Sequence, residues 1–178
     1  MLEALISSRT RIKLLLRFFL NPGTTAYLRG LAEEFDESTN AIRVELNRFE
    51  DAGMLVSESQ GNKKMYKAND RHPLFGDVRS IMMKHIGIDQ IIEVVINRMG
   101  KLEKLYLTGD YAKGKDTGII DLAFVGDVIN KEYLVNMVGK AEKLIDRKVR
   151  FVTYTHEEWE TQQNSKGQSR HLLLWEDK

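Results

Sequence analysis

Hydrophobic positions near the start of the chain repeat with the period of an amphipathic helix. One face of a helix that begins at Thr10 carries four apolar residues: Ile12, Leu15, Leu16 and Phe19. The segment 21–23, Asn-Pro-Gly, then ends the pattern because it favours a turn. A second helical pattern runs from Ala26 to Phe35, and we expect Thr24 and Thr25 to supply its caps.

A third helical pattern lies between Ser38 and Gly53. Its three apolar residues share one helical face: Ile42, Leu46 and Phe49. Ser38 or Asp36 can accept hydrogen bonds from the first N–H groups, and Gly53 can close the helix in a left-handed conformation. The segment therefore indicates a helix that packs on one face and offers the other to a partner. The alternative is an ordinary amphipathic surface helix.

Two runs follow in which apolar and polar residues approximately alternate, one on each side of the segment 60–62. Its Gly and Asn residues tolerate the positive φ of a tight hairpin. The expected hairpin would hold Lys63 and Lys64 at its tip, where ammonium groups can meet phosphate oxygens. The alternative for both lysines is a solvated turn that protects the edge of a sheet.

The segment from Thr10 to Asn69 resembles the winged helix-turn-helix regulators of the MarR-like and ArsR-like kind. The resemblance rests on the motifs LRGLAEEF and STNAIRVELNRFEDAGML and on the hairpin after them. It implies that the helix before Ala52 and Gly53 enters the DNA major groove and that the hairpin, or wing, touches the backbone or the minor groove. The residues implied to face bases or phosphates are Ser38, Thr39, Asn40, Arg43, Val44 and Asn47, with Arg48, Lys63 and Lys64 near the backbone.

Side-chain chemistry fits some of these contacts well. Arg43 can present a fork of donors to guanine, and Asn40 or Asn47 can pair with adenine. Three acids lie on or beside the same helix and would repel phosphate: Glu37, Glu45 and Glu50. Glu45 can instead pair with Arg48 or Arg43, which is the alternative role for those arginines.

The segment 71–100 is rich in aliphatic residues and indicates a helical bridge. Pro73 opens a helix that Gly87 breaks, and we expect Asp89 to cap the next one. The expected apolar side of the first helix consists of Leu74, Val78, Ile81, Met82 and His85. We expect part of this surface to pack against a second copy of the chain, as in two-fold dimers that bind DNA. The alternative is that both helices pack only on their own domains.

Strand and helix patterns alternate in the remainder of the chain. Strands are expected at 104–109, 119–126, 149–155 and 171–178, and a helix at 130–148. Thr155 and Glu158 form the pattern of a capping box at the start of a further short helix. These elements predict a small α/β domain.

The segment from Leu102 to Val152 resembles the minimal nucleotidyltransferases of the polymerase-β-like fold. The matching positions are Gly109, Lys113 and Gly114 in a loop and Asp121 on the following strand. The resemblance implies two metal-binding acids on that strand, but Ile119 stands at the first position. Asp110 replaces the serine that would meet a phosphate, and Arg150 lies on the strand where a third acid is expected.

Two roles are open for the remaining acids. Asp110 and Asp121 could together bind one cation, or Asp116 could serve a turn while Asp121 accepts backbone N–H bonds from the glycine loop. We expect the second arrangement. We therefore expect the domain to be catalytically inactive and the protein not to be an enzyme. Its vestigial ligand site would comprise Gly109, Asp110, Lys113, Gly114 and Asp121.

Composition limits the remaining function classes. The 178 residues carry a net charge of +1, so no global field points to nucleic acid or to a membrane surface. The absence of Cys excludes a disulfide framework and a thiolate metal site. No apolar run approaches the roughly 20 residues of a membrane span. We expect a cytoplasmic protein without membrane contact, metal or cofactor.

The sequence therefore predicts an α+β protein with three parts. They are a winged helix-turn-helix domain at 1–72, a helical bridge at 73–99 and a degenerate nucleotidyltransferase-like domain at 100–178. The expected function is sequence-specific regulation on double-stranded DNA by a homodimer, with dimerisation or sensing of an unidentified small-molecule effector by the last domain. The alternatives are a magnesium-dependent nucleotidyltransferase with a winged-helix substrate-recognition domain, and a protein-interaction adaptor.

Overall fold

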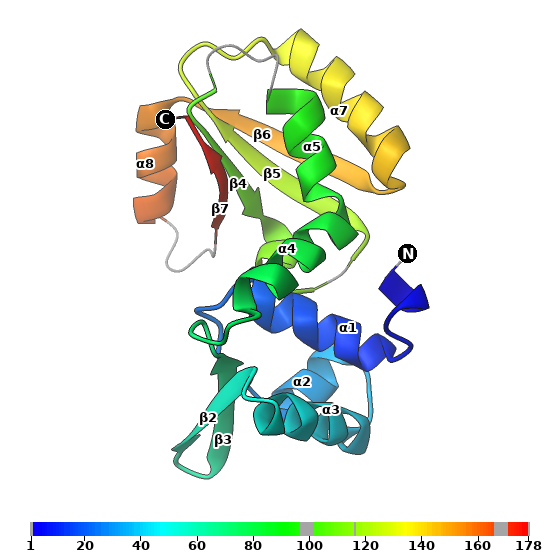
Figure 1. Cartoon of the computed structure of the whole chain (residues 1–178). Coiled ribbons are helices and arrows are strands. Elements are labelled where there is room, and N and C mark those ends of the chain that lie inside the picture. The colour runs from blue at the N-terminus through cyan, green and yellow to red at the C-terminus, as the bar shows by residue number, and fades with distance from the viewer. Residues whose placement is uncertain (1, 97–101, 116, 166–170, 178) are drawn as a thin grey trace. The chain divides into compact units, whose positions relative to one another are not determined.

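A computed structural model describes residues 2–96, 102–115, 117–165 and 171–177. The chain divides into two compact units, Met1–His85 and Ile86–Lys178, which are described here one at a time (Figure 1). Asp116 and the segment 97–101, which includes the end of the expected bridge at 73–99, lie outside the described residues.

The N-terminal unit begins with a short 3₁₀ turn, η1 (Leu2–Ala4), followed by α1 (Arg9–Leu15). A π-helical segment, η2 (Leu16–Leu20), continues α1 up to Asn21, so the predicted helix and its end are confirmed. The face predicted to be apolar is buried together with Leu14, Phe18 and Leu20. This helix therefore forms the centre of the first hydrophobic core.

The predicted start of the second helix is wrong. Ala26 and Tyr27 form a short strand, β1 (Ala26–Tyr27), which pairs with Tyr66 and Met65 across the hairpin. The helix α2 (Leu28–Phe35) starts only afterwards, and its N-cap residue Tyr27 makes no side-chain capping bond. The expected caps fail because strand pairing uses the two residues that were assigned to the first helical turn.

The third helix is confirmed as α3 (Thr39–Asp51). Ser38 caps it by accepting a hydrogen bond from the Ala41 N–H at 3.2 Å. Asp36 instead takes the left-handed conformation that ends α2, with φ of 53°, and Gly53 follows the last turn of α3 with φ of 70°. The predicted apolar face is buried, so α3 packs on one side and exposes the other.

The expected hairpin is also confirmed. Strands β2 (Leu55–Gln60) and β3 (Lys63–Ala68) pair in antiparallel register, with Gln60 opposite Lys63. The turn between them contains Gly61 with φ of 58°, which a residue without Cβ adopts at little cost. Together with β1 these strands form a three-stranded sheet in the order β1-β3-β2.

The helical segment after the hairpin differs from its prediction at two points. In α4 (Phe75–Ile86), Met82 is buried, but Leu74, just before the helix, and Ile81 are 53% and 46% exposed. Gly87, at φ of 85°, holds the N-cap position of α5 (Ile88–Val95), so Asp89 lies in the first turn and does not cap. A Cβ at Gly87 would lie 2.6 Å from a methyl carbon of Ile145, and this close packing explains why a glycine is needed.

The C-terminal unit contains a four-stranded mixed sheet in the order β6-β5-β4-β7. Its strands are β4 (Lys104–Thr108), β5 (Ile119–Val125), β6 (Lys148–Tyr154) and β7 (Leu172–Glu176). The helix α7 (Lys131–Ile145), capped by Asn130, joins β5 to its parallel neighbour β6. The expected mixture of helices and sheet in an α+β protein is confirmed.

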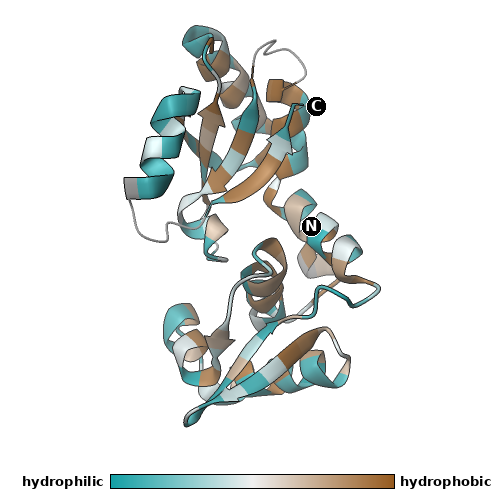
Figure 2. Ribbon diagram, turned by 90° about the vertical axis from the view of Figure 1, so that its left-hand side faces the viewer, coloured by the Kyte–Doolittle hydropathy of each residue, from teal (hydrophilic) through white to brown (hydrophobic). Residues whose placement is uncertain are grey.

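Two helices on opposite sides of this sheet complete the unit. Apolar residues of α7, including Leu134 and Val138, are buried in the core. On the other face Trp159 of α8 (His156–Ser165) packs against Ala123 and Val125, and Figure 2 shows α8 mostly hydrophilic beside largely hydrophobic strands. The capping box is confirmed, since the Thr155 N–H donates to Glu158 and the Glu158 N–H donates to the Thr155 hydroxyl.

Candidate functional site

In the N-terminal unit, a groove lies between α3 and the hairpin. Its volume is about 630 Å³. The described residues that line it include four cations and no carboxylate: Tyr27, Leu28, Arg29, Arg43, Leu46, Asn47, Asn62, Lys63, Lys64 and Tyr66. A groove with this charge favours an anionic ligand.

Arg43 and Asn47 project from the exposed face of α3 into this groove. Within the described parts of the chain, neither side chain has an ion pair or a hydrogen bond. The other residues predicted on this face do not line the groove, although all are exposed: Ser38, Thr39, Asn40, Val44 and Arg48. Arg43 and Asn47 are therefore the α3 side chains best placed to read a ligand in the groove.

The two hairpin lysines have different surroundings. The Lys63 ammonium lies 4.1 Å from the ring centroid of Tyr27. Lys64 binds the Glu50 carboxylate at 2.6 Å and lies 5.1 Å from the ring centroid of Tyr66. The hydrogen bond from Lys64 lowers the pKa of Glu50, and the same bond raises the pKa of Lys64. Lys64 is thus held by a carboxylate, whereas Lys63 rests on an aromatic ring.

Two residues that line the groove, Tyr27 and Arg29, were not predicted from the sequence. Arg29 is exposed near the start of α2 and lines the groove together with the α3 residues. The hydrophobic pattern indicates that Arg29 is exposed, because it lies off the helical face formed by Leu28, Leu31, Ala32 and Phe35. Tyr27 could not be identified in this way, because the pattern had assigned it to a helix.

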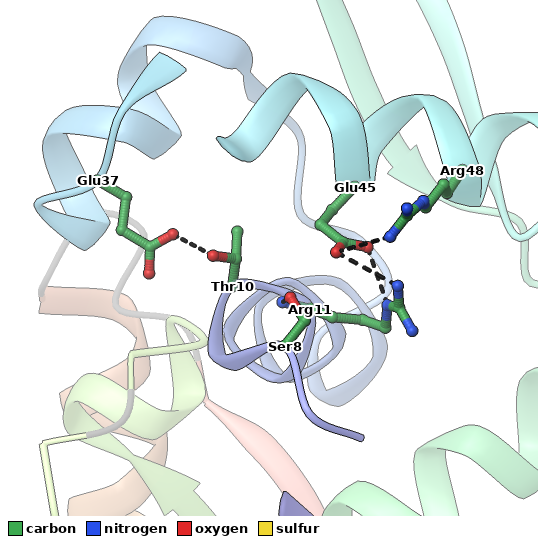
Figure 3. A network of polar contacts seen from close by, with 6 residues as sticks. All are labelled: Ser8, Thr10, Arg11, Glu37, Glu45 and Arg48. Carbon is green, nitrogen blue, oxygen red and sulfur yellow. Dashed lines mark hydrogen bonds and ion pairs between the residues drawn. The ribbon is translucent and has the colours of Figure 1, made fainter. Parts of the chain in front are cut away.

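The acids next to α3 are held from below by α1 (Figure 3). Glu45 is buried, and it accepts hydrogen bonds from Arg11 at 2.9 and 3.3 Å and from Arg48 at 3.2 Å. Of the two alternatives for this acid, the pair with Arg48 therefore forms. Glu37 binds Lys13 at 2.7 Å and accepts a hydrogen bond from the Thr10 hydroxyl.

These contacts keep both carboxylates ionised. Burial by itself raises the pKa of Glu45, but hydrogen bonds from Arg11 and the charges of Arg11 and Arg48 outweigh it, so the pKa is lowered. Burial by itself likewise raises the pKa of Glu37, but the hydrogen bonds from Lys13 and Thr10 and the charge of Lys13 together outweigh it, so the pKa is lowered. The cations of α1 match these negative charges. The repulsion of phosphate that we expected at the α3 face is therefore weaker.

The second predicted site lies at the end of β4 in the C-terminal unit. Gly109 has φ of 64°, and a Cβ there would lie 2.2 Å from an Oδ atom of Asp121. Asp110 lies in the first turn of α6 (Gly109–Ala112), and its carbonyl oxygen accepts hydrogen bonds from the N–H groups of Lys113 and Lys115. Gly114, with φ of 82°, donates its N–H to Tyr111 and completes the turn. The glycine loop is therefore compact and packed against the carboxylate.

Asp121 does not have the partner that we expected. Arg150 lies beside it in the parallel register of β5 and β6 and donates two hydrogen bonds to it, at 2.7 and 2.9 Å. This bidentate contact raises the pKa of Arg150. The expectation that Asp121 is held by backbone N–H groups of the loop is wrong, because a guanidinium on the adjacent strand fits both carboxylate oxygens.

A cavity of about 250 Å³ opens beside the loop. Its lining combines loop residues with the sheet and α8: Thr108, Gly109, Lys113, Leu122, Ala123, Val152, Tyr154, Trp159, Gln162 and His171. The described residues contain no cluster of three potential metal ligands, and Arg150 engages both oxygens of Asp121. The arrangement in this structure does not fit a magnesium ion.

Membrane insertion receives no support from the helices. Within the described ranges, none combines the length and the hydrophobicity that crossing a lipid bilayer requires.

Comparison with solved structures finds several that align with about half of the chain. A proposed nucleotidyltransferase from Sulfolobus solfataricus aligns with 24% identity over 55% of this chain and 82% of that one, with a TM-score of 0.38. Two variants of the toxin-antitoxin complex MntA-HpeT align with 21% and 19% identity, each over 51% of this chain and 73% of the other, also with a TM-score of 0.38. No protein-family model matches the chain. No curated protein matches it either.

These neighbours correct one prediction. We expected the chain not to be an enzyme, but the structures that resemble it include one described as a nucleotidyltransferase. The expectation of a catalytically inactive domain is therefore contradicted and is not retained. None of the three descriptions mentions DNA binding or regulation.

Proposed function

We propose that the N-terminal unit is a winged helix-turn-helix domain that binds double-stranded DNA. The observation that carries this proposal is the groove between α3 and the hairpin, which is lined by four cations and no carboxylate among the described residues. An exposed polar helix beside a basic hairpin is the arrangement with which such domains read a major groove and hold the backbone. The ion pairs of Glu37 and Glu45 with α1 support the proposal, because they compensate the acids near this surface.

The side chains divide into two kinds of contact. Arg43 and Asn47 have the donors and acceptors that recognise guanine and adenine edges, and both lie in the groove. Arg29 and Lys63 also line the groove, and their charged groups would contact phosphates. Such contacts position the protein without reading sequence. The proposal thus assigns base recognition to α3 and backbone contacts to α2 and the hairpin.

In the whole protein this domain would serve a transcriptional regulator. The proposal includes a homodimer that presents two α3 helices about one DNA turn apart. It also includes a small-molecule effector that binds the C-terminal unit and changes DNA affinity by favouring one spacing. Light scattering of the free protein tests the dimer, and a monomer both free and on DNA would remove this part of the proposal.

Fluorescence anisotropy tests DNA binding directly. The protein is titrated with duplex DNA from upstream of its own gene and with a shuffled duplex, over a series of salt concentrations. We expect preference for the native duplex and weakening with salt, because bound cations displace counterions from phosphates. Absence of binding to both duplexes at low salt would refute the proposal.

Two variants separate the kinds of contact. Arg43→Ala should cost about 1 to 3 kcal/mol on the native duplex and much less on the shuffled one. Lys63→Ala should weaken both duplexes equally and reduce the salt slope by about one. Arg71→Ala is a matched control, because Arg71 is exposed but does not line the groove. Equal losses on both duplexes for Arg43→Ala would exclude it from base recognition.

The second candidate function is nucleotidyl transfer by the C-terminal unit. The observation that favours it is the cavity beside the glycine loop, where Gly109 and Lys113 come together near Asp121. Turnover of nucleoside triphosphates, abolished in Asp121→Ala, would support this function. Failure of both DNA binding and nucleotide turnover would favour the protein-interaction adaptor instead.

A further inference from the structure

We propose that Glu50 is an affinity-limiting residue that withholds the hairpin cation Lys64 from phosphate. The inference rests on the proposed DNA-binding function of the groove and goes beyond it. It states that the protein limits its own affinity for DNA of any sequence through one carboxylate at the end of α3.

The geometry shows how a single carboxylate can do this. Glu50 lies in the last turn of α3, and one of its oxygens is 2.6 Å from the Lys64 ammonium. The other oxygen accepts a hydrogen bond from the Ser57 hydroxyl. Ser57 belongs to β2 and Lys64 to β3, so Glu50 ties α3 to both strands of the hairpin. Lys64 therefore has a charged partner before any DNA arrives.

The neighbouring lysine shows what the absence of such a partner means. Lys63 lies over the Tyr27 ring at 4.1 Å, and no carboxylate pairs with it within the described residues. An aromatic ring attracts an ammonium group but does not neutralise its charge. At the hairpin tip, one cation is thus available to a phosphate and the adjacent one is engaged.

The consequence concerns the overall affinity for DNA. Contacts to phosphates add affinity for every sequence, and they raise binding to the competing sites of a genome as much as binding to the target. A phosphate that recruits Lys64 must displace the Glu50 carboxylate first. Glu50 therefore lowers the affinity for DNA of any sequence, target and random alike, while Arg43 and Asn47, which make no contact with it among the described residues, remain able to recognise bases.

The test compares two substitutions that remove the same charge from the same region. Glu50→Gln keeps the size of the side chain and frees Lys64. Glu58→Gln is the matched control, because Glu58 is exposed on β2 and makes no side-chain bond within the described residues. We expect Glu50→Gln to bind a shuffled duplex about three- to tenfold more tightly at low salt, with a salt slope steeper by about 0.9. Glu58→Gln should gain less than half of that.

A double-mutant cycle shows whether the effect passes through Lys64. In the Lys64→Gln background, Glu50→Gln should change the affinity for the shuffled duplex by no more than Glu58→Gln does. An equal gain in both backgrounds would overturn the proposal, because general charge would then explain the effect. If Glu50→Gln fails to fold, Glu50→Asp retains the charge, shortens the reach to Lys64, and should give a smaller gain of the same sign.

The outcomes separate this inference from the proposed function. If the wild-type protein binds neither duplex at low salt, the DNA-binding function itself fails. If the wild-type protein binds but Glu50→Gln behaves like Glu58→Gln, only the role of Glu50 fails.

Discussion

Arg43 in the N-terminal unit and Arg150 in the C-terminal unit are both exposed arginines with opposite surroundings. Arg43 lines a groove that contains no carboxylate among its described residues, whereas Arg150 donates two hydrogen bonds to Asp121. The acids near Arg43 are not missing, because Glu45 lies on the same helix, but they turn toward α1. The comparison shows that the supporting elements decide which cations stay available for a ligand.

The same comparison applies to the carboxylates. Only 7% of the Glu45 side chain is exposed, and the Arg11 that binds it is itself two-thirds covered. Asp121 is nearly as covered at 15%, but its partner Arg150 is 66% exposed. A pair with an exposed partner is screened by water and contributes less to stability than a covered one. Four substitution or pH experiments test this difference.

The largest effect is expected where the backbone itself meets the carboxylate. Gly109→Ala should reduce the unfolding free energy of the C-terminal unit by about 2 to 4 kcal/mol, because the new Cβ collides with Asp121 at a left-handed φ. Trp159 and Trp175 both lie in this unit, so tryptophan fluorescence during urea unfolding measures it.

Gly118→Ala is the matched control for that experiment. Gly118 has a similar φ of 74°, but its Cβ would meet no atom within 4 Å. It should cost only about 1 kcal/mol, which is the backbone penalty alone. Equal losses for the two variants would show that the contact between Gly109 and Asp121 is unimportant.

The second effect concerns the buried carboxylate of the N-terminal unit. Glu45→Gln should cost about 1 to 3 kcal/mol, because it leaves Arg11 and Arg48 without their shared anion. Far-UV circular dichroism during urea unfolding measures it. Glu33→Gln is the control, because Glu33 is exposed and its side chain makes no bond within the described chain. A loss no greater than that of the control would contradict the importance of the network.

The third effect is a pH dependence with a defined sign. The pKa values of Glu37, Glu45 and Glu50 are lowered by folding, so the unfolded state binds more protons near the ordinary glutamate value of 4.5. Their stabilisation is complete above that pH and is lost as pH falls through the folded pKa values. The cost of Glu45→Gln should therefore shrink when urea unfolding is repeated below about pH 4.5. A cost that stays constant would argue against an ionised Glu45 in the folded protein.

The smallest effect is expected from Asp121→Asn. This variant breaks an ion pair whose arginine is 66% exposed, so it should cost less than about 1 kcal/mol. Tryptophan fluorescence measures it as for Gly109→Ala. A loss larger than that of Glu45→Gln would reverse the comparison between the two carboxylates.

Much of the local structure was predictable because its causes are local. Ser38 caps α3, Gly61 permits the hairpin turn, and Thr155 with Glu158 starts α8, each within a few residues of its partner. The start of α2 was not predictable from neighbours, since Tyr27 pairs with Met65 in the hairpin. The predicted helix cap depended only on neighbouring residues, whereas the conformation of Tyr27 is determined by a strand partner that lies far along the chain.

The site was predictable only in part, for the same reason. Arg43, Asn47, Lys63 and Lys64 were expected at a ligand surface, and they do line one groove. Arg29 was missed because it becomes a groove residue only when α2 packs against α3. The role of Arg150 was also missed, because the register of two parallel strands brings it beside Asp121.

By itself the sequence determined where most of the helices, turns and strands form, because hydrophobic period, caps and glycines act over a few residues. Tertiary structure alone decided which charges are paired and which are available, since an ion pair depends on distance in space. Within α3, Glu45 could pair with Arg43 or with Arg48. In the folded protein it pairs with Arg48 and also with Arg11 of α1. Arg43 keeps no ion pair within the described part of the chain, and it lines the groove, where its chemistry can be used.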